Sequence, residues 1–322
     1  MFYEGKVCAV TGGSGFVGTH LVKALLAQNA RVRAIVHERP MIVEDPRIET
    51  VAADLTLQPE CRRALEGAQY VFHCAGAVSA AGVTVNNPMS AITANLAITA
   101  NVLEAAWATK VERIQIFGSS TGYPVSDHPI REDEMWSGPT HPSYFGYGWM
   151  RRYLERMGEF VHQRSGATKV VLVRPTATYG RYDNFDPAAS HVIPALIRKA
   201  VERMDPFEVW GTGDEIRDFL HIEDLARGCL LALEKMPNCE PVNIGYGKVI
   251  TVREIVQDIL DATGHRPKIF FDTTKPTTIP VRMVDCSKAR KVLDFEPTIS
   301  LRDGLRDTVD WFLAQREVGA LT

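Results

Sequence analysis

The sequence lacks the features that mark a metalloprotein, a secreted protein or a membrane protein. Its six cysteines form no CxxC pair and no zinc-type spacing, so we expect reduced, mostly buried thiols and no metal site. No apolar run approaches the ~20 residues of a membrane span, and the first residues lead into a strand instead of a secretion signal. These absences predict a cytoplasmic protein.

An excess of charge of one sign is lacking too. The 322 residues carry 36 Lys and Arg against 39 Asp and Glu, a formal net charge of −3. This near balance gives no reason to expect a nucleic acid or an anionic membrane as a partner. With 45% hydrophobic and 23% charged residues, the chain has the composition of an ordinary globular protein with one large core or two lobes.

The first half of the sequence does contain an alternation of strand-like and helix-like segments. Short apolar runs rich in β-branched residues predict strands, and apolar residues at three- and four-residue spacing predict the helices between them. The predicted strands are 6–12, 31–36, 69–76, 113–120 and 168–175, and the predicted helices are 16–29, 95–110 and 144–164. Strands this apolar predict an α/β fold whose parallel sheet is covered by helices on both faces.

The composition changes after residue 175, where the loops become longer and rich in Pro, Gly and Asp. We therefore expect residues 1–174 to form the main sheet domain. Residues 175–322 are expected to form mainly a smaller lobe over the carboxyl ends of the strands, where open α/β sheets bind ligands. About residues 217–245 are expected to return to the first domain.

The first predicted strand leads into AVTGGSGFVGTHL, which places Gly12, Gly15 and Gly18 between a strand and a helix. A tight turn needs glycine's conformational freedom, and a dinucleotide pyrophosphate needs backbone N–H groups that no Cβ shields. The helix N-terminus adds positive potential. The pattern predicts a doubly wound, Rossmann-type domain that binds a dinucleotide, with Phe16 and Val17 among the cofactor-binding residues.

The identity of the dinucleotide depends on the end of the second strand. NAD-binding domains place an acidic side chain there for the ribose 2′-hydroxyl, whereas His37 and Arg39, with Arg33, suit a 2′-phosphate. We therefore predict NADP, with NAD as the alternative if Glu38 takes the acidic role. The remaining predicted cofactor-binding residues are Asp54, expected near the adenine amino group, Leu55 and Ala75.

Further motifs run through nearly the whole chain, namely VFHCAG, NLAITANVLEAA, FGSSTGYP, YGWMR, RPTATYG, RDFLHIEDLARG, VNIGYG and DCSKARKVLDFEP. By these and the glycine turn, the protein resembles the extended short-chain dehydrogenases/reductases, the NAD-dependent epimerase/dehydratase family that acts on nucleotide sugars. Two stretches of the second half, DNFDPAASHVIPALIRKA and VWGTGDEIRDFLHIEDLA, are similar to the GDP-L-fucose synthase group, which epimerises and reduces a GDP-linked 4-keto-6-deoxy sugar.

The resemblance implies a catalytic centre. The family's catalytic Ser/Thr lies four residues before the tyrosine of its SSxxYP motif, here Ser119 before Tyr123. The catalytic tyrosine then falls on Tyr147 rather than Tyr144, at 147 − 119 = 28 positions, and the family's lysine position holds Arg151.

These residue types suit the reduction of a sugar ketone. The reaction needs a proton donor whose pKa is near the working pH, and a cation one helical turn from a phenol, which titrates near ~10 when free, favours its ionised form. Arg151 keeps that cation but cannot release a proton. We therefore expect an active but altered site; a degenerate site and a motif misaligned by one turn are the alternatives.

A second departure concerns epimerisation. In the fucose synthase group, a cysteine after GSS and a histidine before VIPAL move protons at the carbons beside the ketone. Here the histidine is His191, but the cysteine position holds Thr121. A thiol titrates near ~8.5 and can serve as a base, whereas a threonine hydroxyl cannot do so unaided. This argues against double epimerisation, and the alternative role for His191 is to cap or pack in the second lobe.

On the substrate side, Arg217 matches the family arginine that binds the sugar-nucleotide pyrophosphate, and a guanidinium fork suits phosphate oxygens. Trp210 matches a residue that packs on the base of GDP sugars, and its alternative is a core tryptophan at a strand end. Weaker candidates for substrate contact are Asn184, Ser190 and Arg198.

The resemblance thus implies an NADP-dependent oxidoreductase that reduces the 4-keto group of a nucleotide-linked, preferably GDP-linked, deoxy sugar. The alternatives are a nucleotide-sugar 4-epimerase with tightly bound NAD and a cofactor-sensing protein without catalysis. By resemblance alone, helices 95–110 and 144–164 are expected to form the four-helix interface of a homodimer.

Overall fold

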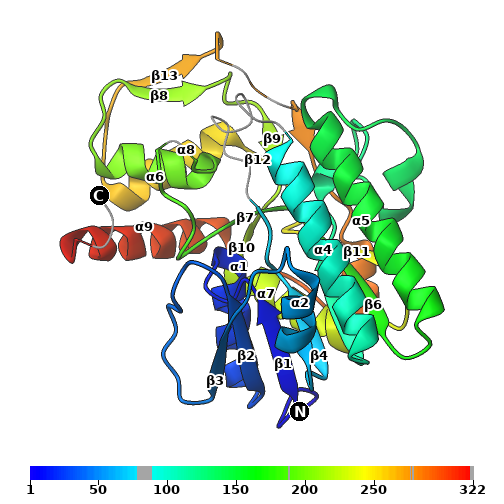
Figure 1. The fold of residues 1–322 in the computed structure, drawn as a ribbon. Helices are drawn as coiled ribbons and strands as arrows, with labels where there is room; N and C mark the ends of the chain where they lie inside the picture. The colour runs from blue at the N-terminus through cyan, green and yellow to red at the C-terminus, as the bar shows by residue number, and fades with distance from the viewer. Residues whose placement is uncertain (78–88, 188, 276, 278, 320–322) are drawn as a thin grey trace.

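The computed structural model describes residues 1–77, 89–187, 189–275, 277 and 279–319. Within them, seven parallel strands form the central sheet in the order β11-β6-β5-β4-β1-β2-β3 (Figure 1). The strands are β1 (Val7–Thr11), β2 (Arg31–Val36), β3 (Ile48–Ala52), β4 (Tyr70–His73), β5 (Arg113–Phe117), β6 (Lys169–Pro175) and β11 (Pro241–Ile244). The chain leaves β1 toward both edges of the sheet, so the strand order reverses beside β1, the point at which doubly wound sheets bind nucleotides.

Helices cover both faces of this sheet, as its apolar strands require. One face packs against α1 (Phe16–Ala27) and α7 (Ile222–Lys235) in one buried cluster. The other packs against α2 (Gln58–Leu65), α4 (Ser90–Ala108) and α5 (Phe145–Arg164) in a second cluster. Short 3₁₀ turns η1 (Ser120–Gly122), η2 (Glu132–Trp136) and η3 (Pro142–Tyr144) lie between β5 and α5, and the π-turn η4 (Ala289–Leu293) packs on α7.

The second lobe has its own core, built by α6 (Val192–Val201), α8 (Val252–Thr263) and α9 (Leu301–Glu317). A parallel ribbon of β8 (Phe207–Trp210) and β13 (Ile269–Asp272) covers it at one end. Two smaller sheets connect the lobes: β7 (Ala177–Tyr179) with β10 (Phe219–His221), and β12 (Ile250–Thr251), β9 (Ile216–Arg217) and β14 (Val281–Arg282).

The predicted fold class, a Rossmann-type doubly wound parallel sheet with a smaller lobe, is confirmed. Strand 31–36 has the predicted bounds, but strands 69–76 and 113–120 end earlier, at His73 and Phe117. The residues beyond each end turn out of the sheet at its carboxyl edge and become part of the candidate site. No helix of the described residues is both long and apolar enough to cross a bilayer.

Candidate active site

The glycine turn between β1 and α1 has the backbone geometry that phosphate binding requires. Gly12 adopts a φ of +65°, and a Cβ atom on it would lie 3.0 Å from the backbone of Ala75 beyond β4. A Cβ atom on Gly18 would lie 2.1 Å from the Gly12 carbonyl oxygen, so only glycine lets α1 pack this closely on the turn. The helix begins after Gly15 with no acidic residue in its first turn. Its first N–H groups have no intrahelical partner, so the turn fits a dinucleotide pyrophosphate.

Below this turn, a buried hydrogen-bond chain joins β1, β4 and α4. The Thr11 hydroxyl lies 2.8 Å from Nδ1 of His73 and accepts the N–H groups of Cys74 and Ala75 at 3.0 Å each. Nε2 of His73 lies 3.1 Å from the Thr99 hydroxyl. Burial, with a smaller effect from the charge of Arg151, lowers the pKa of His73 to about 3. This neutral histidine fixes the turn, and its only signal in the sequence is a polar residue ending an apolar strand.

The end of β2 carries the side chains predicted to select the dinucleotide. His37, Glu38 and Arg39 are all exposed. Arg33, expected beside them, is engaged elsewhere: its Nε donates to Glu49 at 2.8 Å, and its Nη1 donates to two carbonyl oxygens at the end of α2. That expectation was wrong, because the Arg33 side chain satisfies free carbonyl groups of a helix terminus instead.

Asp54 follows β3 and lies near His37. Its carboxylate accepts the N–H and the hydroxyl of Thr56 at 2.9 and 2.7 Å, and these hydrogen bonds, with a smaller effect from His37, lower its pKa. Leu55 is buried beside it. An ionised acceptor at this edge is suited to an amino group, as predicted for the adenine.

Ser119 and Thr121 lie just beyond the end of β5. Their hydroxyls are 2.8 Å apart, and Ser119 Oγ also accepts the Thr121 backbone N–H at 3.2 Å. Helix α5 packs directly on this segment, because a Cβ atom on Gly148 would lie 2.7 Å from the Thr121 carbonyl oxygen. The structure therefore brings the serine segment against the helical turn that carries Tyr147.

Arg151 is hydrogen-bonded to the phenol of Tyr147. Its Nη2 donates to the phenol oxygen at 2.6 Å, and its Nη1 donates to the Phe117 carbonyl oxygen at 3.3 Å. Its Nε is buried and has no hydrogen-bond partner among the described residues. A charge-assisted hydrogen bond from a permanent cation stabilises a phenolate.

His191 precedes α6, but its side chain does not cap that helix. The side chain is 62% exposed, and its Nδ1 lies 3.7 Å from Oδ1 of Asp183, whose side chain is 2% exposed. This carboxylate raises the pKa of His191. The alternative of a capping or packing histidine is therefore wrong, and an accessible imidazole stands beside a buried acid.

Two arginines lie opposite each other on neighbouring strands, since Arg217 of β9 is in register with Arg282 of β14. Each donates to backbone carbonyl oxygens, Arg217 to Ile216 and Pro280 and Arg282 to Pro124. Burial lowers the pKa of both guanidinium groups. Nη2 of Arg282 is buried without a hydrogen-bond partner in the described part of the chain. Sequence analysis missed Arg282, because nothing local shows that it faces Arg217.

The other predicted substrate residues are Trp210, Asn184, Ser190 and Arg198. Trp210 is 52% exposed with Lys275 above its ring, so the core alternative is wrong. The Asn184 amide is used within its own loop, accepting from the Asp186 N–H at 3.0 Å. Ser190 is half-buried, and Arg198 Nη1 lies 3.8 Å from Glu202. Among the described residues, no hydrogen bond or ion pair joins this group to Tyr147.

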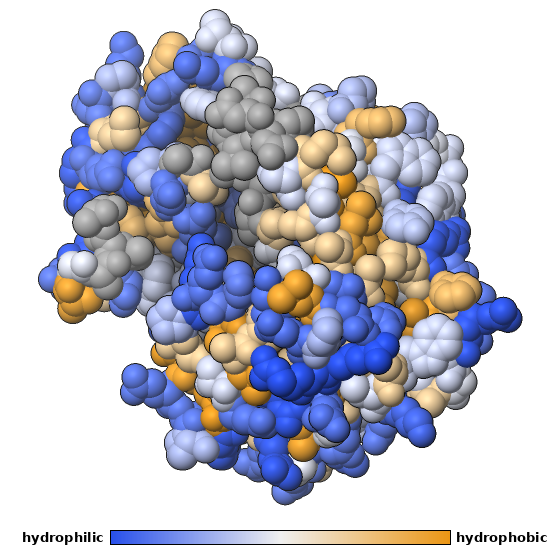
Figure 2. All heavy atoms as spheres, in the orientation of Figure 1, coloured by the Kyte–Doolittle hydropathy of each residue, from blue (hydrophilic) through white to orange (hydrophobic). Residues whose placement is uncertain are grey.

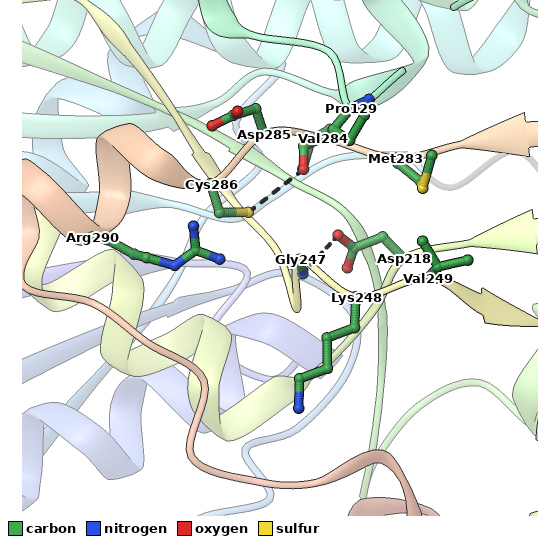
Figure 3. Close-up of a pocket in the computed structure, with 10 residues that line it drawn as sticks. All are labelled: Pro129, Asp218, Gly247, Lys248, Val249, Met283, Val284, Asp285, Cys286 and Arg290. Atoms are coloured by element: carbon green, nitrogen blue, oxygen red, sulfur yellow. Dashed lines mark hydrogen bonds between the residues drawn. The ribbon is translucent and has the colours of Figure 1, made fainter. Parts of the chain in front are cut away.

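A cavity of about 210 Å³ is lined by, among others, Asp218 and Met283, the residues that follow Arg217 and Arg282 in the sequence (Figure 3). In its wall, the Asp218 carboxylate accepts the N–H groups of Tyr246 and Gly247 at 2.7 and 3.0 Å, and burial raises the pKa of Asp218 to about 6. The Arg290 guanidinium is directed toward Gly247. The residues that line the cavity include none of the predicted catalytic residues.

The glycine turn and the Ser119, Tyr147 and Arg151 group together define a class: an α/β enzyme that uses a nicotinamide dinucleotide. The model of the NAD dependent epimerase/dehydratase family matches residues 8–245. The chain belongs to this family, and the predicted resemblance is confirmed; it is an NAD(P)-dependent enzyme of the nucleotide-sugar reductase and epimerase type.

Relatives within the family differ in substrate. GDP-L-fucose synthase 1 of Arabidopsis thaliana is 32% identical over 311 residues, covering 94% of this chain and 92% of that protein. The dTDP-4-dehydro-6-deoxy-D-allose reductase of Streptomyces sp is 29% identical, with coverage of 96% and 97%. The solved structure of MoeE5 in complex with UDP-glucuronic acid and NAD is 27% identical, with a TM-score of 0.83 and coverage of 97% and 100%.

Proposed function

We propose that the protein reduces the 4-keto group of a nucleotide-linked deoxy sugar, with NADPH as the preferred reductant and GDP as the preferred nucleotide. The observation that carries the proposal is the 2.6 Å hydrogen bond from Arg151 to the Tyr147 phenol, on a helix packed against Ser119. Similarity to the Arabidopsis GDP-L-fucose synthase and the Streptomyces keto-sugar reductase supports this substrate class.

When bound, a nicotinamide dinucleotide supplies the hydride that reduces the ketone carbon. Tyr147 donates the proton to the carbonyl oxygen, and Ser119 orients that oxygen by a hydrogen bond. Arg151 stabilises the phenolate left behind. Because a guanidinium does not release a proton at neutral pH, the phenol is reprotonated through water or the substrate and not through Arg151.

The residues that would hold the dinucleotide are the glycine turn, the start of α1 and the exposed end of β2. His37 and Arg39 suit a 2′-phosphate, which favours NADP. The exposed Glu38 and the NAD-bound relative MoeE5 favour NAD. Arg151 takes the place of the family's lysine, and its guanidinium is proposed to contact the ribose next to the nicotinamide.

The arginine pair of Arg217 and Arg282 is proposed to bind the substrate pyrophosphate. Two guanidinium groups held side by side repel one another until an anion bridges them, and their unused donors suit phosphate oxygens. The exposed ring of Trp210 offers a stacking surface for the base. A guanine and a thymine can both stack there, so the nucleotide preference rests on the similarity to GDP-L-fucose synthases.

Epimerisation at both neighbouring carbons is not part of the proposal. Thr121 hydrogen-bonds Ser119, and its hydroxyl is not a base at neutral pH. His191 beside Asp183 remains as one exposed imidazole, which could exchange a proton at one carbon only.

Two other functions stay as competitors. A 4-epimerase that keeps NAD bound would oxidise and re-reduce the same carbon without consuming added cofactor. A cofactor-sensing protein would bind the dinucleotide without turnover. A sensor needs no aligned proton donor, so the hydrogen bond between Arg151 and Tyr147, close to Ser119, argues against this function.

A homodimer through α4 and α5 is also proposed. Figure 2 shows apolar side chains gathered on the α4 and α5 face. The exposed large side chains of α5 include Phe145, Trp149, Tyr153 and Phe160, and Trp107 of α4 contacts Phe160. Burial of such a patch by a second copy is favourable.

The proposal is tested by incubating the protein with NADPH or NADH and GDP-, dTDP- and UDP-linked 4-keto-6-deoxy sugars. We expect stoichiometric NADPH consumption with the GDP-linked substrate. Product formation from a 4-hydroxy sugar without net cofactor consumption would support the epimerase. Cofactor binding without turnover of any sugar would support the sensor.

A further inference from the structure

The face of α5 that carries Tyr147 and Arg151 continues one turn further to Glu155. Residues four apart lie on one side of a helix. Glu155 forms a two-pronged ion pair with Arg174 of β6, in which Nε donates to Oε1 at 2.9 Å and Nη2 donates to Oε2 at 2.6 Å. The two side chains are 5% and 2% exposed, so this pair lies in the interior, about two helical turns along α5 from the proposed proton donor.

The ion pair also packs against the segment that carries Ser119. A Cβ atom on Gly118 would lie 2.1 Å from Oε1 of Glu155 and 2.9 Å from Cγ of Arg174, so the backbone just before Ser119 rests on the pair. Nη1 of Arg174 donates to the Tyr123 hydroxyl at 2.9 Å. The Arg174 side chain therefore lies against both ends of the segment 118–123, with its Cγ near Gly118 and its guanidinium on Tyr123.

At its other end, the segment 118–123 is held by a hydrogen bond between Tyr123 and β11, the edge strand of the central sheet. The Tyr123 hydroxyl donates to Oδ1 of Asn243 in β11 at 2.6 Å. Nδ2 of Asn243 donates to the carbonyl oxygens of Ile130 and Asp285 at 3.1 and 3.0 Å. Tyr123, Asn243 and Arg174 are all buried, so the hydrogen bonds are shielded from water and hold the segment rigidly.

We propose that Glu155 and Arg174 are positioning residues that set the separation between the Ser119 hydroxyl and the Tyr147 phenol. Glu155 fixes the helix, Arg174 fixes the serine segment, and their bidentate contact prevents either element from sliding past the other. The proposal rests on the proposed reductase function, in which both groups must reach one carbonyl oxygen. Small errors in such an alignment reduce turnover strongly.

A purely structural ion pair makes a different prediction. Apolar residues of similar volume often replace a buried ion pair without loss of stability, whereas removing one partner leaves an uncompensated buried charge. The paired replacement Glu155→Leu with Arg174→Met therefore leaves no unpaired buried charge while it removes the bidentate contact. It also removes the hydrogen bonds of Arg174 Nη1 to the Tyr123 hydroxyl and the Glu132 carbonyl oxygen. If the pair serves stability alone, this variant keeps full activity.

The test measures kcat, KM and the NADPH Kd of this double variant. We expect kcat to fall roughly 100-fold, the effect of about 1 Å of misplacement, with KM and Kd changed less than about threefold. The control is Arg62→Met with Glu104→Leu, which removes an exposed ion pair between α2 and α4 and should leave kcat unchanged.

Two further measurements keep the proposal falsifiable if the double variant does not fold. Gly118→Ala retains the ion pair but displaces it from the segment, and should lower kcat in the same way. Crystal structures of parent and variant should differ in the distance from Ser119 Oγ to the Tyr147 phenol. Unchanged kcat in the folded variants, or superimposable hydroxyls, overturns the positioning role. Inactivity of the parent toward every keto sugar overturns the proposed function instead, and the crystal comparison still decides the positioning role.

Discussion

The glycine turn and the arginine pair are both suited to a pyrophosphate, but they are built in opposite ways. The turn uses backbone N–H groups and a helix N-terminus within residues 12–18, and it contains no charged side chain. The arginine pair uses two full charges from residues 282 − 217 = 65 positions apart, brought together by the register of β9 and β14. The first site is a property of local conformation, and the second is a property of tertiary packing.

This difference has an energetic consequence. The turn is stable without its ligand, because its dipoles point outward and its glycines are unstrained. The arginine pair places like charges side by side in partly buried surroundings, which opposes folding until an anion arrives. Substrate binding should therefore stabilise the second lobe more than cofactor binding stabilises the turn.

The largest effect is expected from removal of the Tyr147 hydroxyl, the proposed proton donor, which must act on the bound substrate next to the bound cofactor. Tyr147→Phe should lower kcat about 10³-fold, within the range for loss of a general acid, while the NADPH Kd stays unchanged, because the phenol hydroxyl is not needed for the glycine turn. Stopped-flow absorbance of NADPH checks it. Tyr153→Phe, an exposed tyrosine on the same helix, is the control. Loss of cofactor binding in Tyr147→Phe would contradict the assignment.

Gly18→Ala tests the glycine turn, which is proposed to bind the cofactor through backbone N–H groups. Its Cβ would collide with the Gly12 carbonyl oxygen, so α1 must move away from the turn. We expect the NADPH Kd to rise about 100-fold, or about 2.7 kcal/mol, measured by fluorescence titration. Gly138→Ala, whose Cβ would meet only a proline side-chain atom at 3.3 Å, should bind normally. Equal affinity in both variants would show that the turn does not hold the cofactor.

Arg282→Met tests the arginine pair, which is proposed to bind the substrate pyrophosphate through its two charges. Loss of a charge-assisted hydrogen bond of ~2 kcal/mol should raise the KM for the sugar nucleotide about 30-fold, with kcat nearly constant. Without substrate, the Tm should stay equal or rise, because the repulsion of Arg217 is relieved. Arg253→Met, an exposed arginine of the same lobe, is the control. A lower Tm with an unchanged KM would make Arg282 a structural residue only.

Thr121→Cys tests whether the cysteine of the GDP-L-fucose synthase group, placed at position 121, can act as a base on the substrate. A thiol, titrating near ~8.5, should raise deuterium uptake from heavy water at a carbon beside the ketone by roughly tenfold, since its thiolate is a base. Mass spectrometry of the sugar measures the exchange, and Thr121→Ser is the control. An unchanged exchange rate would mean that position 121 does not face the substrate carbon.

The last prediction concerns stability instead of catalysis and involves Asp218, which directly follows Arg217 of β9. Its pKa is raised from 3.8 to about 6, so between these values the folded protein keeps a proton that the unfolded chain releases. Stability should therefore fall as the pH rises from about 4 to 6, by at most ~3 kcal/mol. Urea unfolding at several pH values should show this slope in the parent and a smaller one in Asp218→Asn. Identical slopes would contradict the assignment.

The sequence predicted the sheet and the glycine turn from local patterns, whereas the Tyr147 centre followed from the family resemblance. It did not predict that Arg33 binds the end of α2 or that His73 supports the turn, and it left open whether Trp210 is exposed. Each of these depends on which element packs beside the residue. Arg282 was missed for the same reason, although Arg217 was found through the resemblance.

The amino-acid sequence by itself determined the fold class and the dinucleotide turn, since apolar periodicity and glycine positions act over a few residues, and the candidate catalytic residues came from its resemblance to a family. Only the tertiary structure decided that Arg151 bonds the phenol directly, that Arg217 faces Arg282 and that a buried ion pair lies below the serine segment. Strand register and helix packing join residues far apart in the chain, and no local pattern encodes those contacts.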